Sequence, residues 1–140
     1  MEWSTLQTEY EGLPLYLRKP NYKNIYEYKT KYPELICITH EFDNVKDNGL
    51  PTSEYNKSLI DFDNEVVNIF QEKNNGIIFL VETYGGARNY WFFGENSESI
   101  SSLFNDLKNK YSKNKLELDS QNHSDWTFLE EYPVPLYKKI

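Results

Sequence analysis

The N-terminal part of the chain alternates apolar and polar positions, and this pattern predicts a β-hairpin. Residues 3–10 alternate, and in residues 13–18 leucine recurs at every second position, as on one face of a strand. Pro14 has no N–H to donate to a neighbouring strand. We therefore expect the hairpin to lie at an edge of its sheet.

The next two segments have different patterns. Residues 19–33 are rich in tyrosine, carry a proline near each end and show no clear period. They predict a connecting segment with room for one helical turn. Residues 34–42 are apolar on both faces, which is typical of a strand in the middle of a covered sheet.

A run of turn-forming residues at 43–52 precedes the first predicted helix, which Thr52 or Ser53 is expected to cap. From Ser53 to about Lys73, apolar residues recur at intervals of three and four, as on one face of an amphipathic helix. Its opposite face is acidic, with Glu54, Asp61, Glu65 and Glu72.

The second half of the chain predicts two strands, a helix and a last strand. Residues 77–84 form the most apolar strand, and Gly85-Gly86 predicts a tight turn into a strand at residues 88–93. Strict alternation would place Ile77, Phe79 and Val81 on one face of the first strand and Ile78 and Leu80 on the other. A second amphipathic helix follows through residues 100–111, then a short strand at 116–119 and a helical turn within 125–132.

These elements predict one α+β domain over residues 1–140. The six central elements follow the order β-α-β-β-α-β, in which two helices cover one face of an antiparallel sheet. We therefore expect a ferredoxin-like core at residues 34–121, extended by the N-terminal hairpin at residues 1–18. Residues 19–33 connect the two, and residues 122–140 form a C-terminal tail.

The net charge of −7 argues against a general nucleic-acid binder and favours a basic protein partner. The charge is uneven, because residues 18–32 hold five cations and one acid, a local +4 that leaves −11 on the remainder. Cations interleaved with tyrosines would suit single-stranded nucleic acid. The segment contains no glycine, however, and its tyrosines are equally suited to packing over the sheet, so we do not expect nucleic acid.

The sequence also favours a cytoplasmic location. Its longest apolar run, residues 77–81, is too short to span a membrane, and Met1-Glu2-Trp3 does not begin a signal peptide. Cys37 is the single cysteine, so no internal disulfide forms, and we expect its thiol to be buried in the core.

The common catalytic and metal-binding motifs are absent from the sequence. There is no Gly-x-Ser-x-Gly elbow, phosphate-binding glycine loop or His-Glu-x-x-His helix. The two histidines, His40 and His123, lack a second ligand at a metal-binding spacing, and Cys37 and His40 point to opposite faces of a strand. We expect no catalytic residue, no metal and no cofactor, and an enzymatic role has no motif to support it.

Arg88 is the strongest single candidate for a ligand contact. It follows the Gly85-Gly86 turn and starts an aromatic strand, where its guanidinium is suited to a carboxylate or phosphate. The alternative is a structural ion pair with the tail acids Asp125, Glu130 or Glu131. A ligand pocket here would combine Arg88 and Trp91 with the loop residues Gly49 and Pro51 and with Asp125 and Trp126 of the tail.

The chain resembles a bacterial family of domains of unknown function, number six hundred and ninety-five. The residues that carry the resemblance are Trp3, the segments 32–35, 49–51 and 83–88, and the tail pairs Asp125-Trp126 and Tyr132-Pro133. Some members of that family are joined to a domain similar to a protein regulator of ribonuclease activity. The resemblance therefore implies a regulatory or interaction role, without an established activity.

The leading hypothesis is a non-catalytic protein-binding module, such as a regulator, an inhibitor or an immunity-type protein, whose acidic surface meets a basic partner. The first alternative is a small-molecule-binding or enzymatic pocket near Arg88 and Trp126. The second is single-stranded nucleic-acid binding through residues 18–32. The sequence does not fix an oligomeric state.

Overall fold

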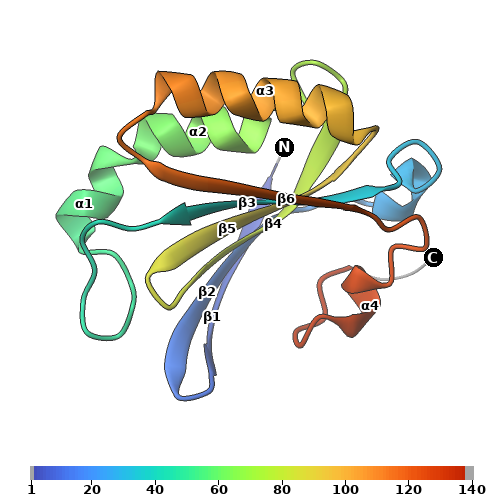
Figure 1. Ribbon diagram of the computed structural model, residues 1–140. Helices are drawn as coiled ribbons and strands as arrows, with labels where there is room; N and C mark the ends of the chain where they lie inside the picture. The colour runs from blue at the N-terminus through green and yellow to red at the C-terminus, as the bar shows by residue number, and fades with distance from the viewer. Residues whose placement is uncertain (1, 138–140) are drawn as a thin grey trace.

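A six-stranded antiparallel sheet runs through the computed structural model, which describes residues 2–137 (Figure 1). Its strands are β1 (Trp3–Tyr10), β2 (Leu13–Pro20), β3 (Glu34–Glu41), β4 (Gly76–Tyr84), β5 (Ala87–Gly94) and β6 (Lys115–Asn122). The helices are a 3-10 turn, η1 (Ile25–Tyr28), and α1 (Ser53–Ser58), α2 (Ile60–Asn68), α3 (Ser97–Lys110) and α4 (Phe128–Glu131). Residues 1 and 138–140, which end the predicted domain and tail, lie outside the described residues.

The strands follow the order β1-β2-β4-β5-β3-β6, and every neighbouring pair is antiparallel. The predicted hairpin is confirmed as β1 and β2, with β1 at the edge of the sheet. β2 pairs with β4 only through residues 16–18, so Pro14 lies outside that ladder and its missing N–H costs no bond to β4.

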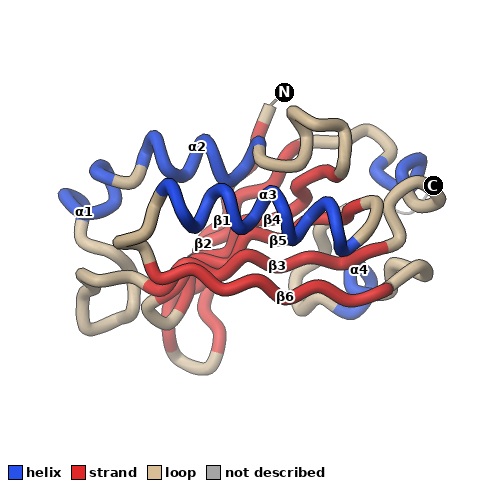
Figure 2. The backbone as a smooth tube through the Cα atoms, turned by 45° about the horizontal axis from the view of Figure 1, so that its top comes forward, coloured by secondary structure: helices blue, strands red, loops and turns tan. Residues whose placement is uncertain are grey.

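Helices α2 and α3 lie side by side over one face of the sheet in both views (Figures 1 and 2). They enclose a helix-side core in which Phe62, Val66 and Phe104 pack over Ile36, Ile38 and Phe92 of the strands. Thr52 caps α1 and accepts a hydrogen bond from the Tyr55 backbone N–H, as expected.

The opposite face of the sheet is covered by η1, α4 and the C-terminal tail, which form a tail-side core with Leu17, Phe79 and Phe93. In Figure 1, α4 lies beneath the sheet, away from α2 and α3. No helix among the described residues is long and apolar enough to cross a membrane.

The first long helix differs from the prediction, because it is divided at Leu59. The backbone there has φ −93° and ψ 1°, and α2 begins at Ile60 in a new direction. The division lets α1 and α2 each direct a polar side chain at the same point of the sheet, Asn56 from α1 and Asp63 from α2.

The faces predicted for β4 are wrong beyond Phe79. A β-bulge at Phe79 shifts the register with β5, so that Ile78 pairs with Phe92 and Leu80 pairs with Trp91. Phe79 and Leu80 therefore both lie in the tail-side core, and Val81 joins Ile78 in the helix-side core.

Candidate functional site

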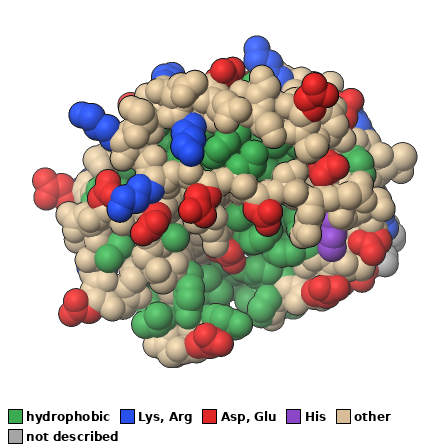
Figure 3. All heavy atoms as spheres, viewed as in Figure 1, with side chains coloured by type: hydrophobic (Ala, Val, Ile, Leu, Met, Phe, Trp, Pro, Cys, Tyr) green, Lys and Arg blue, Asp and Glu red, His purple; other side chains and the backbone are tan. Residues whose placement is uncertain are grey.

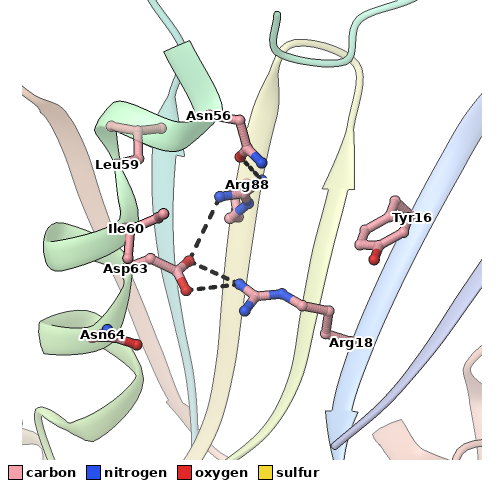
Figure 4. A pocket seen from close by; sticks show the side chains of 8 residues that line it. All are labelled: Tyr16, Arg18, Asn56, Leu59, Ile60, Asp63, Asn64 and Arg88. Carbon is pink, nitrogen blue, oxygen red and sulfur yellow. Dashed lines mark hydrogen bonds and ion pairs between the residues drawn. The ribbon is translucent and has the colours of Figure 1, made fainter. Parts of the chain in front are cut away.

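A half-open cavity of about 290 Å³ lies between α1, α2 and the strands β2 and β5. Tyr16 and Arg18 approach from β2, Arg88 from β5, Asn56 from α1, and Asp63 from α2 (Figure 4). Alternation along β2 directs Tyr16 and Arg18 toward the helices, while Leu15 and Leu17 enter the other core.

Asp63 is the centre of this cavity. Its Oδ1 and Oδ2 accept hydrogen bonds from Nη2 of Arg18 at 2.8 and 3.0 Å, and its Oδ1 accepts a third from the Tyr90 hydroxyl at 2.7 Å. Nη1 of Arg88 lies 3.6 Å from the same Oδ1. The carboxylate of this buried residue thus links α2 to two strands, β2 through Arg18 and β5 through Tyr90 and Arg88.

Arg88 is held by groups of the helix side. Its Nε donates to Thr83 Oγ1 at 2.9 Å and its Nη2 donates to Asn56 Oδ1 at 2.9 Å. The predicted ion pair with a tail acid is wrong. Arg88 points toward α2, and its carboxylate partner is Asp63, whereas the tail lies on the opposite face of the sheet.

Two titratable groups near Asp63 and Arg88 have pKa values that are shifted by their surroundings. Burial, with a further contribution from Asp63, raises the pKa of Tyr90 well above its usual range, so its hydroxyl remains a donor. Burial and the nearby Arg88 guanidinium lower the pKa of His40 to about 4, which keeps that ring neutral at pH 7.

The cavity combines two guanidinium groups and one carboxylate, a formal charge of +1. Asn56 and Asn64, both exposed, add amide groups at its rim. Such a set favours an anion over a cation. Across residues 2–137, no group of three or more His, Cys, Asp and Glu is placed to hold a metal ion.

Gly49 and Pro51 were predicted to line a ligand pocket, but Gly49 packs against the β4–β5 turn and Pro51 pairs within its own loop. The Gly49 carbonyl accepts a hydrogen bond from the Gly86 N–H at 2.8 Å, and Pro51 forms an isolated bridge with Val45. The Gly49-Leu50-Pro51 loop does not line the cavity of Arg18 and Arg88.

Trp126 and Asp125 are not brought together with Arg88. Trp126 is fully buried in the tail-side core, where it stacks on Phe93 at 3.8 Å and its indole N–H donates to the Tyr32 carbonyl at 2.8 Å. Asp125 is exposed and accepts a hydrogen bond from the Thr127 N–H. The sheet separates these residues from Arg88, so the single pocket predicted from the sequence does not form.

Trp91 also belongs to the tail side, where its indole N–H donates to Glu82 Oε1 at 2.8 Å. The aromatic strand β5 is therefore covered on both faces, by the helices over Tyr90 and by the tail over Trp91.

The acidic surface predicted on the first helix is present, but part of its charge is compensated. Glu54, Asp61 and Glu72 are exposed. Glu65 is half-buried and pairs with Lys110 of α3 at 2.5 Å.

The tyrosines of residues 18–32 pack against the tail-side core. Tyr32 is buried there, and Tyr22 donates to the Ile78 carbonyl at 2.9 Å. Because these rings pack within the protein, they no longer support the hypothesis that residues 18–32 bind single-stranded nucleic acid by stacking.

The sequence analysis missed Asp63, Tyr16 and Asn56, and it treated Arg18 only as part of a basic segment. Asp63 had a detectable signal, because it lies four residues after Leu59 and three before Val66, on the apolar face of the helix. A carboxylate at such a position needs a partner when the helix packs.

The comparison with protein families agrees with the resemblance found in the sequence. A model described as a family of unknown function (DUF695) matches residues 2–132. No curated protein and no solved structure matches the chain significantly. Since the family model covers nearly all of the sequence, the chain belongs to this family of unknown function, DUF695.

Proposed function

We propose that this protein is a non-catalytic binding protein that holds a carboxylate or phosphate group in the cavity between Arg18 and Arg88. One observation carries the proposal: the chain has two arginines, and both reach this half-open cavity. Guanidinium groups hold carboxylates and phosphates through paired N–H donors.

Arg18 has N–H donors that remain available for a ligand. Among the bonds within residues 2–137, Arg18 uses Nη2 alone, which leaves its Nε and Nη1 available. The Arg18 side chain is 27% exposed, whereas that of Arg88 is 8% exposed. Arg18 is therefore the group that meets the ligand, and Arg88 holds Asp63 and Asn56 in place behind it.

The test is a titration with inorganic phosphate, followed by NMR of the arginine Nε–H groups. The chain has two arginines, so two such signals are expected, and Arg18→Gln assigns them. We expect a saturable shift of the Arg18 signal at constant ionic strength. Binding by Arg18→Gln should be at least about tenfold weaker, because a hydrogen bond to a charged group contributes about 1.5–3 kcal/mol.

Lys19→Gln is the matched control, because Lys19 is the next residue of β2 and its ammonium lies 4.6 Å from the Tyr137 ring, on the other face. It removes the same charge and should leave phosphate binding unchanged. Equal binding by all three proteins would contradict the proposal.

Asp63→Asn separates a ligand site from a purely structural ion pair. It removes the negative charge beside the arginines, and a unit charge about 4 Å away contributes about 1–4 kcal/mol. Phosphate should therefore bind this variant about tenfold more tightly, even though the variant is less stable. A loss of stability without a gain in phosphate affinity would leave Asp63 and Arg18 with a structural role only.

We also propose that the segment from β3 to β6 is ferredoxin-like. Its strand order, β4-β5-β3-β6, supports this, because each β-α-β unit encloses one antiparallel strand between its own two strands. The binding role proposed above does not depend on this assignment.

A further inference from the structure

A second cavity opens on the opposite face of the sheet, between the hairpin of β1 and β2 and the segment after α4. Its volume is about 260 Å³, and the rings of Tyr10, Tyr84 and Tyr132 line it together with Leu15 and Glu82. It shares no lining residue with the cavity of Arg18 and Arg88.

Within residues 2–137, the side chains that donate hydrogen bonds to Glu82 are all neutral. Its Oε1 accepts hydrogen bonds from Asn89 Nδ2 at 3.0 Å and from Trp91 Nε1 at 2.8 Å, and its Oε2 accepts one from the Tyr132 hydroxyl at 2.5 Å. Burial, with Glu82 adding to it, raises the pKa of Tyr132 well above its usual range, so this hydroxyl stays a donor.

The charge of Glu82 has no cationic partner within residues 2–137. A carboxylate offers about four lone-pair positions, and three donors occupy three of them. One acceptor position is therefore left for a donor from outside the protein.

The tyrosines supply the second half of a cation site. An aromatic ring attracts a cation over its face, most strongly where water is partly excluded. The Tyr84 ring is fixed, because its hydroxyl donates to the Tyr10 carbonyl at 2.8 Å and the two rings form a T-shaped pair with 5.8 Å between centroids.

The surface around this cavity suits a basic binding partner. In Figure 3, hydrophobic side chains gather in the lower half of the view, around the β1–β2 hairpin of Figure 1. The prominent Lys and Arg side chains lie in the upper half of that view. The net charge of −7 draws cationic partners toward the molecule.

We propose that this cavity binds a lysine or arginine side chain of a partner protein. Its charged end donates to Glu82, and its alkyl chain lies against Leu15 and the tyrosine rings. The volume is below the range of about 300–1,000 Å³ that is usual for small-molecule pockets, and it suits one long side chain. This site is independent of the anion site proposed above.

The experiment follows the indole N–H signal of Trp91 by NMR, because that group bonds directly to Glu82. The probes are N-acetyl-lysine methylamide and its neutral analogue, N-acetyl-norleucine methylamide. We expect a saturable shift with the lysine probe that weakens with salt, and none with norleucine. Glu82→Gln should weaken lysine binding by about tenfold or more, as expected when a charge-assisted hydrogen bond is lost.

Glu117→Gln is the matched control, because it makes the same charge change on β6, at the far edge of the sheet. It should bind the lysine probe as the wild type does, and so should Arg18→Gln. If Glu82→Gln fails to fold, Tyr84→Leu supplies the second variant, since it keeps the carboxylate and removes one ring.

Three outcomes would overturn the proposal. Equal binding by the Glu82→Gln and Glu117→Gln variants would show that only the overall charge matters. An equal shift with the norleucine probe would show that the cavity selects an alkyl chain without regard to charge. Tighter binding of putrescine than of the blocked lysine would assign the cavity to a small free amine.

Discussion

Asp63 and Glu82 are two carboxylates with opposite surroundings. Asp63 is buried against Arg18 and Arg88, so the protein itself compensates its charge. Glu82 receives hydrogen bonds from Asn89, Trp91 and Tyr132, which orient it without neutralising it. This difference is why we place the first carboxylate in the proposed anion site, where it competes with the ligand, and the second in the proposed cation site, where it accepts a hydrogen bond from the ligand.

Gly49 has a structural role that its place in a loop did not reveal. Its φ is +85°, and an added Cβ would lie 2.9 Å from the Gly85 Cα and 3.1 Å from the backbone nitrogens of Gly85 and Gly86. Gly49→Ala should therefore destabilise the protein through both an unfavourable dihedral angle and a backbone clash.

Gly12→Ala separates these two effects, because Gly12 has nearly the same φ, +83°, and no atom of the described residues lies within 4 Å of an added Cβ. We expect Gly12→Ala to lower the free energy of unfolding by about 1–2 kcal/mol. Gly49→Ala should lower it by roughly 1–3 kcal/mol more, as overpacking does. Urea denaturation of both variants measures the difference, and equal losses would show that the loop moves aside.

At the scale of elements, the hydrophobic pattern located the strands and both long helical segments, because each buries a regular face. It did not reveal the division at Leu59 or the bulge at Phe79, since both depend on how the element meets its neighbours. The bulge has a functional consequence. With strict alternation from Ile78, Glu82 would face the helices, whereas the extra residue turns it toward the tail and into the second cavity.

The sequence does not show how an element meets its neighbours, and this also explains which part of each site was predictable. Arg88 stood out in the sequence as a rare residue next to a turn, but the carboxylate beside it is that of Asp63, which the sequence did not indicate. Its partner, Asp63, lies 25 positions away on an element whose rotation the sequence does not fix. Trp126 had an equally clear signal, but the sequence does not tell which face of the sheet the tail covers.

Trp126 packs the tail against the second face of the sheet. Its ring stacks on Phe93 and is fully buried, and its indole N–H is bonded to the Tyr32 carbonyl. Trp126→Ala should lower the free energy of unfolding by about 3–5 kcal/mol, as large-to-small changes of buried aromatics do.

Trp3→Ala is the control for this substitution, because Trp3 lies on the edge strand and is 37% exposed. Trp3→Ala should lower the free energy of unfolding by less than about 1 kcal/mol. Chemical denaturation of both variants gives the comparison, and a small loss for Trp126→Ala would mean that the tail contributes little to the folded state.

At the scale of the molecule, the sheet separates two cores, and each proposed site opens on its own face. His40 belongs to the helix side, where it is fully buried beside Phe62 and Phe42. Its Nε2 lies 3.2 Å from Asn114 Nδ2, and its Nδ1 is buried without a partner within residues 2–137. The charged groups that influence it are Arg88, which disfavours its protonation, and Asp43 and Asp63, which favour it.

This burial predicts a loss of stability in weak acid. The pKa of His40 falls from 6.5 to about 4 on folding, so between these values the unfolded chain binds a proton that the folded protein does not. Unfolding is then favoured as the pH falls, by about 3 kcal/mol over the whole window at 1.36 kcal/mol per pH unit. His40→Gln removes this contribution, because glutamine does not titrate. Urea denaturation at pH 7 and pH 4.5 should therefore show a smaller loss for the variant than for the wild type, and equal losses would mean that His40 takes up its proton in the folded protein.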